Sequence, residues 1–345
     1  MRVLSISPEL PSPENPGTMA ATARQLDSLR ALGVDVQVLE MKGIPKLKYL
    51  AAIPRMRSLL QNVDLVHAHY GYCGWLARLQ WRKPIVMSYM GSDLLGEIAD
   101  DGGLEWLSRV MLAPNRRLAG LVDEVIVKSE EMARIVAPIK AHVIANGVDL
   151  EAFQPRDKAA VRRELGWSTE GRYVLFPGNP DTPRKGYPLA SEAVQCAAAR
   201  MVAPIEIVPL KGVSPDRVAA YMNACDAMLM TSLIEGSPNV VKEAMACNLP
   251  VAGVPVGDVE QMLDGVPGYR VGPRDAAQLG VHLVELLNWP RERVEGRSTI
   301  RRRGLDLEGV ARRVLDVYDE ALGRLPESRT TGKGQPRHDF AACIH

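Results

Sequence analysis

The sequence predicts an α/β protein that contains two parallel-sheet domains. Short apolar runs alternate with stretches whose apolar residues recur at helical spacing, and this alternation is typical of strands and helices that wind around parallel sheets. A charged, proline-containing stretch near residue 155 interrupts the alternation, which then starts again. The length of 345 residues also fits two domains of roughly 150 residues each.

The first Rossmann-like domain is predicted to span residues 1–152 and to contain six strands. Between the first two strands, apolar residues from Met19 to Leu32 recur at helical spacing, and Gly33 is placed to end that helix as a C-cap glycine. The predicted strands lie at residues 3–7, 34–39, 65–69, 85–89, 124–128 and 142–145.

The second domain is predicted to span residues 153–305. Its four predicted strands lie at residues 173–177, 205–209, 227–231 and 251–254. An amphipathic helix is expected at 306–324, and the polar residues 326–345 are expected to form a disordered tail. Since small molecules bind at the carboxyl ends of parallel strands, the cleft between two such domains is the expected site.

Composition argues against several classes of protein. The 42 basic and 41 acidic side chains nearly balance, unlike those of a dedicated nucleic-acid binder. No apolar run reaches the roughly 18 residues of a membrane-spanning helix, and Pro8 interrupts the first apolar run too early for a signal peptide. The five cysteines include no Cys-x-x-Cys pair, so neither a disulfide framework nor a zinc site is expected. We therefore expect a cytoplasmic protein.

The clearest chemical signal is the segment 235–246, Glu-Gly-Ser-Pro-Asn-Val-Val-Lys-Glu-Ala-Met-Ala, which follows a predicted strand. Ser237 is expected to cap a helix whose first residue is Pro238. The backbone N–H groups of Asn239 and Val240 would then be free to bind an anion such as phosphate. A well-capped helix with solvated glutamates is the alternative interpretation.

Two glutamates flank this helix start. Glu235 precedes the helix and Glu243 lies about one and a half turns inside it, and a carboxylate can accept hydrogen bonds from two vicinal hydroxyls. The whole segment resembles the Glu-x7-Glu signature of family 4 of the retaining glycosyltransferases, which have the two-domain GT-B fold. The resemblance implies that Glu243 holds a ribose and that Glu235 is a catalytic residue that positions the donor sugar.

Residues 176–186 resemble the family's Gly-Arg…Lys-Gly segment, whose cations neutralise the donor diphosphate. Lys185 matches the lysine, but Asn179 follows Gly178 where the family has arginine. The resemblance therefore implies that Lys185 and Arg184 are catalytic residues. The alternative interpretation of these two cations is a solvated loop pair.

The resemblance covers most of residues 1–325 and implies further donor contacts. Gly17 lies in a segment similar to the family's glycine loop, and the loop at 209–213 is similar to the one beside the nucleobase. The expected donor-binding residues are Gly17, Gly178, Asn179, Gly212, Val213, Gly236, Ser237, Pro238, Asn239, Val240, Val241 and Glu243.

One residue departs from the family pattern near the reacting centre. Met90 stands before Gly-Ser-Asp, where many relatives have a histidine. Methionine cannot donate a hydrogen bond or carry a proton. His69, Tyr89 and Asp93 are the candidates to compensate, and we expect them in the acceptor or sugar pocket; a different donor is the alternative.

No metal site is expected. His67 and His69 point to the same face of a strand, like half of a metal site, but no third ligand is suggested nearby. The chain also has no Asp-x-Asp pair, the usual metal-holding carboxylates of the other major glycosyltransferase fold. These observations favour a metal-independent enzyme with no cofactor.

Charge is distributed unevenly along the chain. Residues 41–90 contain eight basic side chains and one acidic side chain, and within 42–60 the cations alternate with apolar residues. A basic amphipathic stretch is typical of a membrane-surface contact. A half-buried surface helix is the alternative.

The expected function is transfer of a sugar, with retention, from a nucleoside diphosphate sugar (UDP or GDP) to a glycan or lipid-linked acceptor. Cell-envelope or exopolysaccharide synthesis, at the inner face of the membrane, is the expected setting. A GT-B sugar-nucleotide epimerase is one alternative, and the departures at Met90 and Asn179 keep open a catalytically silent nucleotide-sugar-binding protein. No Gly-x-Gly-x-x-Gly follows the first strand, which argues against a nicotinamide dehydrogenase.

Overall fold

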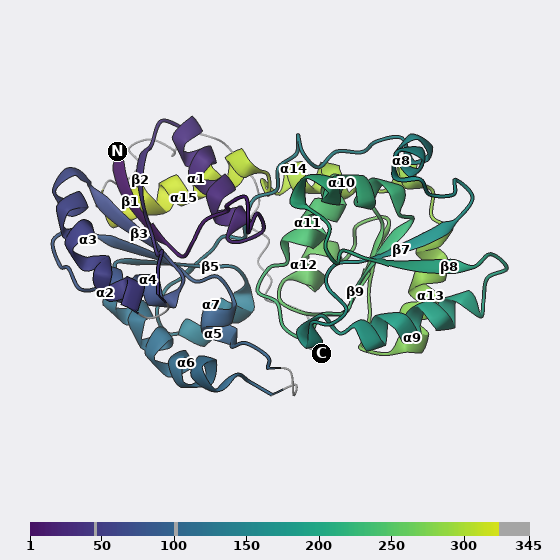
Figure 1. The fold of residues 1–345 in the computed structure, drawn as a ribbon, viewed down its shortest axis with the longest axis horizontal. Helices are drawn as coiled ribbons and strands as arrows, with labels where there is room; N and C mark the ends of the chain where they lie inside the picture. Colours follow the sequence, from purple (N-terminus) through teal and green to yellow (C-terminus); the bar gives the residue numbers. More distant parts are fainter. Residues whose placement is uncertain (45–46, 100–102, 324–345) are drawn as a thin grey trace, which may run out of the picture.

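The computed structural model describes residues 1–44, 47–99 and 103–323, which form two α/β domains side by side (Figure 1). The N-terminal sheet has six strands in the order β2-β1-β3-β4-β5-β6, and the second has five in the order β11-β10-β9-β7-β8. Neighbouring strands in both sheets run parallel. The predicted α/β class with two parallel sheets is therefore confirmed. The tail expected at 326–345 lies outside the described residues.

The strands of the N-terminal sheet are the six predicted apolar runs, with ends shifted by at most two residues. Because helices cover both faces of a parallel sheet, its central strands are buried, and β3 is buried at all five positions, His67 and His69 included. The strands are β1 (Arg2–Ser7), β2 (Asp35–Glu40), β3 (Leu65–His69), β4 (Ile85–Ser88), β5 (Glu124–Val127) and β6 (His142–Val143). The helices are α1 (Ala20–Ala31), α2 (Leu47–Ala51), α3 (Ile53–Leu59), α4 (Gly71–Ala77), α5 (Ser92–Leu95), α6 (Trp106–Leu118) and α7 (Glu130–Val136).

The second sheet contains the four predicted strands and one more. The extra strand, β11, has three residues at the sheet edge, and two of them are partly exposed, so it lacks the apolar run that marks the others. The strands are β7 (Arg172–Phe176), β8 (Ile205–Pro209), β9 (Ala227–Met230), β10 (Val251–Gly253) and β11 (Tyr269–Val271). The helices are α8 (Lys158–Leu165), α9 (Tyr187–Ala198), α10 (Pro215–Ala224), α11 (Asn239–Ala246), α12 (Val259–Leu263), α13 (Ala276–Leu287) and α14 (Gly296–Arg302).

The chain crosses between the domains twice, and the two crossings lie side by side. The Val148 amide donates to the Leu305 carbonyl at 2.9 Å. After this contact, α15 (Leu307–Ala321) runs back across the N-terminal domain, where it packs on α1 (Figure 1). Val310, Val314 and Tyr318 bury its apolar face in that domain's core. This helix corresponds to the one predicted at 306–324.

The described helices include none that is both long enough and apolar enough to span a bilayer. Loops that follow the carboxyl ends of β1, β4, β7 and β9 converge where the domains face each other. These loops carry most of the residues singled out from the sequence.

Candidate active site

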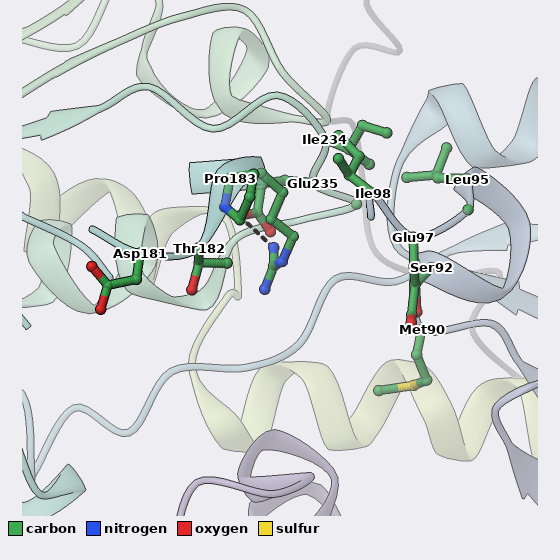
Figure 2. Close-up of a pocket in the computed structure, with 14 residues that line it drawn as sticks. Met90, Ser92, Leu95, Glu97, Ile98, Asp181, Thr182, Pro183, Ile234 and Glu235 are labelled. Carbon is green, nitrogen blue, oxygen red and sulfur yellow. Dashed lines mark hydrogen bonds and ion pairs between the residues drawn. The ribbon is translucent and has the colours of Figure 1, made fainter. Parts of the chain in front are cut away.

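The cleft between the domains contains two adjoining cavities of about 490 and 760 Å³. Both are lined by Met90 of the N-terminal domain and by Glu235 and Gly236 of the second domain. Figure 2 shows the smaller cavity, with Met90 and Ser92 on one side and Pro183 and Glu235 on the other. A ligand that fills both cavities would therefore contact both domains.

The start of α11 forms one wall of the larger cavity. The helix begins at Asn239 with Pro238 as its N-cap residue, and both line this cavity together with Val240. The predicted cap by Ser237 is wrong, because its hydroxyl oxygen instead accepts a hydrogen bond from Lys242 Nζ at 2.7 Å. Within the described part of the chain, the N–H groups of Asn239 and Val240 have no acceptor, so they are available to an anion.

Glu235 brings the two predicted cations together. Lys185 Nζ donates to Glu235 Oε1 at 2.7 Å, and Arg184 Nη1 donates to the same oxygen at 3.2 Å. Glu235 and Lys185 are largely buried, whereas the Arg184 side chain is 43% exposed. An ammonium has three donors, so Lys185 retains donors for a phosphate while it holds Glu235.

Glu243 faces the other domain across the larger cavity. Its Oε1 accepts a hydrogen bond from Arg24 Nη2 of α1 at 3.2 Å, between residues 219 apart in the sequence. Burial raises the pKa of Glu243, and the neighbouring Arg24 guanidinium opposes that rise. Oε2 is left for another donor, such as a hydroxyl of a ribose. No local sequence pattern marks Arg24, because its pairing with Glu243 depends on the fold, which places α1 beside α11.

Two family models match the chain, one in each domain. The model described as Glycosyltransferase Family 4 matches residues 12–152, and the model described as Glycosyl transferases group 1 matches residues 186–288. The chain belongs to the family 4, group 1 glycosyltransferases. Met90 and Glu235, which line both cavities, lie one in each matched range.

Curated relatives named D-inositol 3-phosphate glycosyltransferase, from Mycobacterium tuberculosis and Mycobacterium bovis, are 27% identical over 325 residues. The match covers 81% of this chain and 66% of each relative, so the chain spans just under two thirds of their length.

Among solved structures, sucrose-phosphate synthase from Thermosynechococcus elongatus has a TM-score of 0.74 at 17% identity, over 93% of this chain and 99% of that one. The Anabaena protein HepE in complex with UDP and glucose has a TM-score of 0.67 at 16% identity, over 92% and 99%. The likeness confirms the predicted GT-B fold of this glycosyltransferase.

The remaining expected donor-binding residues of the glycosyltransferase fall into two groups. Gly17, Val213, Gly236 and Ser237 line the larger cavity with the α11 residues described above. The second group lies outside both cavity walls and consists of Gly178, Asn179, Gly212 and Val241.

Three residues of the second group have roles in the protein's own structure. A Cβ on Gly178 would lie 3.1 Å from Lys185 Cγ, so the glycine leaves room for that side chain. Asn179 Oδ1 accepts a hydrogen bond from the Asp181 amide and so orders the loop. Val241 is part of the core.

The structure places His69, Tyr89 and Asp93 behind the cleft wall instead of in the expected acceptor or sugar pocket. Asp93 accepts hydrogen bonds from the amides of Met90, Gly91 and Gly71, so it fixes the loop after β4. Burial raises its pKa to about 6, against the effect of these amides. The Tyr89 hydroxyl donates to the backbone, and His69 is fully buried beside His67. Met90, the residue that departs from the family pattern, itself faces both cavities.

Each domain also contains a buried lysine near the cleft, Lys128 and Lys242, and neither was predicted from the sequence as a site residue. Lys128 follows β5, and its Nζ donates to the Ile144 carbonyl at 3.4 Å. Burial, together with the smaller effect of the Lys242 charge, lowers its pKa to about 7. Burial also lowers the pKa of Lys242, to about 8. A charged residue that directly follows a buried parallel strand was the available signal for Lys128.

One group of potential metal ligands occurs among the described residues, away from the cleft, at Glu124, His142 and Glu320. His142 Nε2 hydrogen-bonds Glu124 Oε2 at 2.8 Å, and Lys140 pairs with Glu320 at 3.1 Å. Because the three side chains already pair with each other or with Lys140, we interpret the group as an ion-pair cluster at the sheet edge.

Proposed function

We propose that the protein transfers a sugar from a nucleoside diphosphate sugar to an acceptor hydroxyl, with retention at the anomeric carbon and without a metal ion. One observation carries the proposal: the Glu235, Lys185 and Arg184 cluster and Glu243 line the same cleft, on either side of the α11 N-terminus. This arrangement has a place for each part of such a donor.

The leaving diphosphate is the group that gains negative charge in the transition state. Lys185, Arg184 and the free N–H groups at the start of α11 would stabilise it electrostatically. These groups are fixed by the fold before the donor binds, so little reorganisation is needed as charge develops. They perform the neutralisation that a metal ion performs elsewhere, which supports a metal-independent reaction.

Glu235 is assigned to the sugar. One of its carboxylate oxygens accepts hydrogen bonds from two cations, which lowers its nucleophilicity, and the residue lines both cavities. We therefore assign it to binding sugar hydroxyls near the anomeric centre instead of covalent attack. The alternative, a sugar-nucleotide epimerase, would use the same donor site without an acceptor.

The first donor to test is UDP-glucose, because solved HepE structures of the same fold contain UDP or UDP-glucose. The acceptor is proposed to be a glycan or lipid-linked sugar of the cell envelope, reached by a cytoplasmic protein at the inner face of the membrane. The basic stretch at 42–60 supports a membrane-surface contact, since cations attract an anionic leaflet. The names of the curated relatives add D-inositol 3-phosphate to the acceptor panel.

The test is a panel of UDP-, GDP- and ADP-sugars scored for thermal stabilisation and slow hydrolysis in EDTA, followed by acceptors. We expect one donor class to stabilise the protein and to be hydrolysed slowly, and NMR of the transfer product to show the anomeric configuration of the donor. Epimerised donor in the absence of acceptor would support the epimerase. Stabilisation with neither hydrolysis nor transfer would support a silent binding protein, and no stabilisation by any sugar nucleotide would contradict the proposal.

A further inference from the structure

A second, chemically different cavity lies on the N-terminal domain, outside the cleft. It has a volume of about 710 Å³, within the range of small-molecule sites, and is bounded by α2, α3, α4 and α6. We call it the chain pocket. Its walls are apolar or aromatic except for Lys48, and they include Tyr49, Leu50, Tyr72, Leu79 and Met111.

Several apolar side chains at and beside the chain pocket are exposed to solvent. Leu50 and Leu79 line it although they are 65% and 57% exposed. On α6, which supplies Met111 to the wall, Trp106 is 73% exposed and Val110 is 52% exposed. Clustered exposed apolar side chains mark a surface that an apolar ligand or partner covers.

A row of tyrosines links the chain pocket to the active-site cleft. The ring of Tyr49 lies 5.6 Å from that of Tyr72, and the ring of Tyr72 lies 5.9 Å from that of Tyr70. The Tyr70 side chain in turn interacts with Ser92, which lines the smaller active-site cavity. Tyr70 holds a φ of 76°, a conformation that is strained for a bulky residue and is typical of functional sites.

The three tyrosines are suited to contact an amphiphilic molecule along its length. Tyrosine presents an apolar ring and a polar hydroxyl, so it suits the region where an apolar chain gives way to a polar head. Lys48 is the one charged residue among the described residues of the pocket wall, with its ammonium 5.8 Å from the Tyr49 ring centroid, and the apolar stem of a lysine can lie along an apolar chain. An occupant with one apolar chain and a polar head matches the apolar pocket at one end and the tyrosine hydroxyls at the other.

We propose that the chain pocket binds the apolar chain of an amphiphilic acceptor whose polar head follows Tyr72 and Tyr70 into the cleft. The inference rests on the proposed transfer activity and specifies its acceptor class. It requires one chain held in an open pocket between α2, α3, α4 and α6, which distinguishes it from contact with a bilayer surface.

The test measures binding of hexyl, octyl, decyl and dodecyl glucoside below their micelle-forming concentrations, by calorimetry and without a donor. We expect the Kd to fall about fourfold for each added methylene until the pocket is filled. In Leu79→Asp, which places a charge at the mouth, we expect the dependence on chain length to disappear. Val281→Asp is the matched control, because Val281 is a 51% exposed apolar residue on α13 of the other domain.

Thermal stabilisation by UDP, measured on both variants, shows whether fold and donor site are intact. A Kd that does not depend on chain length, or a dependence that persists in Leu79→Asp, would overturn the chain pocket. So would loss of binding to anionic phospholipid vesicles in Leu79→Asp with no effect on the glucosides, because that pattern assigns the surface to a bilayer. The glucoside titration contains no donor, so its result does not depend on sugar transfer. Binding that depends on chain length, without sugar transfer in the donor panel, would therefore count against the proposed function and not against the chain pocket.

Discussion

At the scale of single residues, both signature glutamates are paired with cations. Glu235 holds Lys185 and Arg184, and Glu243 holds Arg24. A donor would exchange these pairs for its own groups: its phosphates attract the cations, and its hydroxyls donate to the carboxylates. The pairs keep the buried charges compensated until then.

Lys185→Ala should lower kcat/KM roughly ten- to hundredfold, because a hydrogen bond between charged groups contributes ~1.5–3 kcal/mol. Steady-state kinetics with the donor found in the panel would measure the loss. Lys140→Ala, which removes an exposed lysine paired with Glu320, is the control and should leave kcat/KM unchanged. Equal rates for both variants would remove Lys185 from the site.

Glu243→Gln should weaken nucleotide binding by roughly tenfold, because a neutral amide oxygen accepts hydrogen bonds from ribose hydroxyls less strongly than a carboxylate. Calorimetric titration with UDP or GDP measures the change. Glu308→Gln alters an exposed glutamate that pairs with Arg312 on α15 and serves as the reference. A Kd that matches that of the wild type would refute the ribose assignment.

Lys128 should make stability depend on pH. Its folded pKa of about 7 lies below its ordinary value of 10.5, because burial disfavours the charged form. Between these two values the unfolded chain binds more protons than the folded one, so stability rises with pH in that window. The destabilising contribution is fully present below pH 7, falls through the window and vanishes above it.

Lys128→Met removes that contribution, so the variant should be more stable than the wild type at pH 6, and the difference should shrink toward pH 10. Tm measured against pH for both proteins gives the answer. The buried Lys242, with a folded pKa of about 8, and the buried Asp93 are present in both proteins, so their effects largely cancel in the difference. A difference that is constant with pH would contradict the lowered pKa.

The site residues that could be predicted from the sequence are those that lie within short, contiguous motifs. The segment 235–246 and Lys185 lie within short motifs, and the fold places most of them in one cleft. Arg24 could not be predicted, because its partner Glu243 is 219 residues away. The burial of His69, Tyr89 and Asp93 could not be predicted from the sequence either, because the amides of Met90 and Gly91 use the Asp93 carboxylate only once the loop after β4 has folded.

At the scale of elements, buried strands were the most predictable part of the fold. The strand β9 is buried at every position and consists of apolar residues only, so its sequence marks it directly. The edge strand β11 gives no such signal. The basic stretch at 42–60 divides into α2 and α3, with Pro54 in the first turn of α3, where a missing amide costs little.

The two crossings between the domains approach too closely for a side chain at one position. A Cβ on Gly147 would lie 2.9 Å from the Asp306 carbonyl oxygen and 2.9 Å from Leu307 Cα, both backbone atoms. Gly147→Ala should therefore lower the free energy of unfolding by ~1–3 kcal/mol, as overpacking does. Chemical denaturation measures this.

Gly120→Ala is the control for Gly147→Ala, since its Cβ would meet Ile139 Cδ1 at an ordinary 3.6 Å. It should change stability by a few tenths of a kcal/mol at most. Similar losses in both variants would mean that the crossings can separate without strain.

At the scale of the whole molecule, the proposed donor site includes residues that make contacts between the domains. Arg24 of the N-terminal domain pairs with Glu243, and Asn146 Nδ2 donates to Asn239 Oδ1 at 3.2 Å. Gly91 and Gly236 meet between the domains: a Cβ on Gly91 would lie 3.8 Å from the Gly236 amide. A donor that binds Glu243 and Asn239 therefore competes with contacts that hold the domains together.

Arg24→Ala tests this coupling, because it removes the ion pair that joins α1 to α11. Without Arg24, the ligand-free protein should open, and small-angle X-ray scattering should record a larger radius of gyration. UDP or GDP affinity should fall about three- to tenfold, since Glu243 becomes an unpaired buried carboxyl whose pKa rises further and which accepts ribose hydroxyls less well. Arg30→Ala, on the same helix but paired with Asp27 within it, should change neither quantity. If both variants keep the wild-type radius and affinity, the ion pair between the domains is incidental to donor binding.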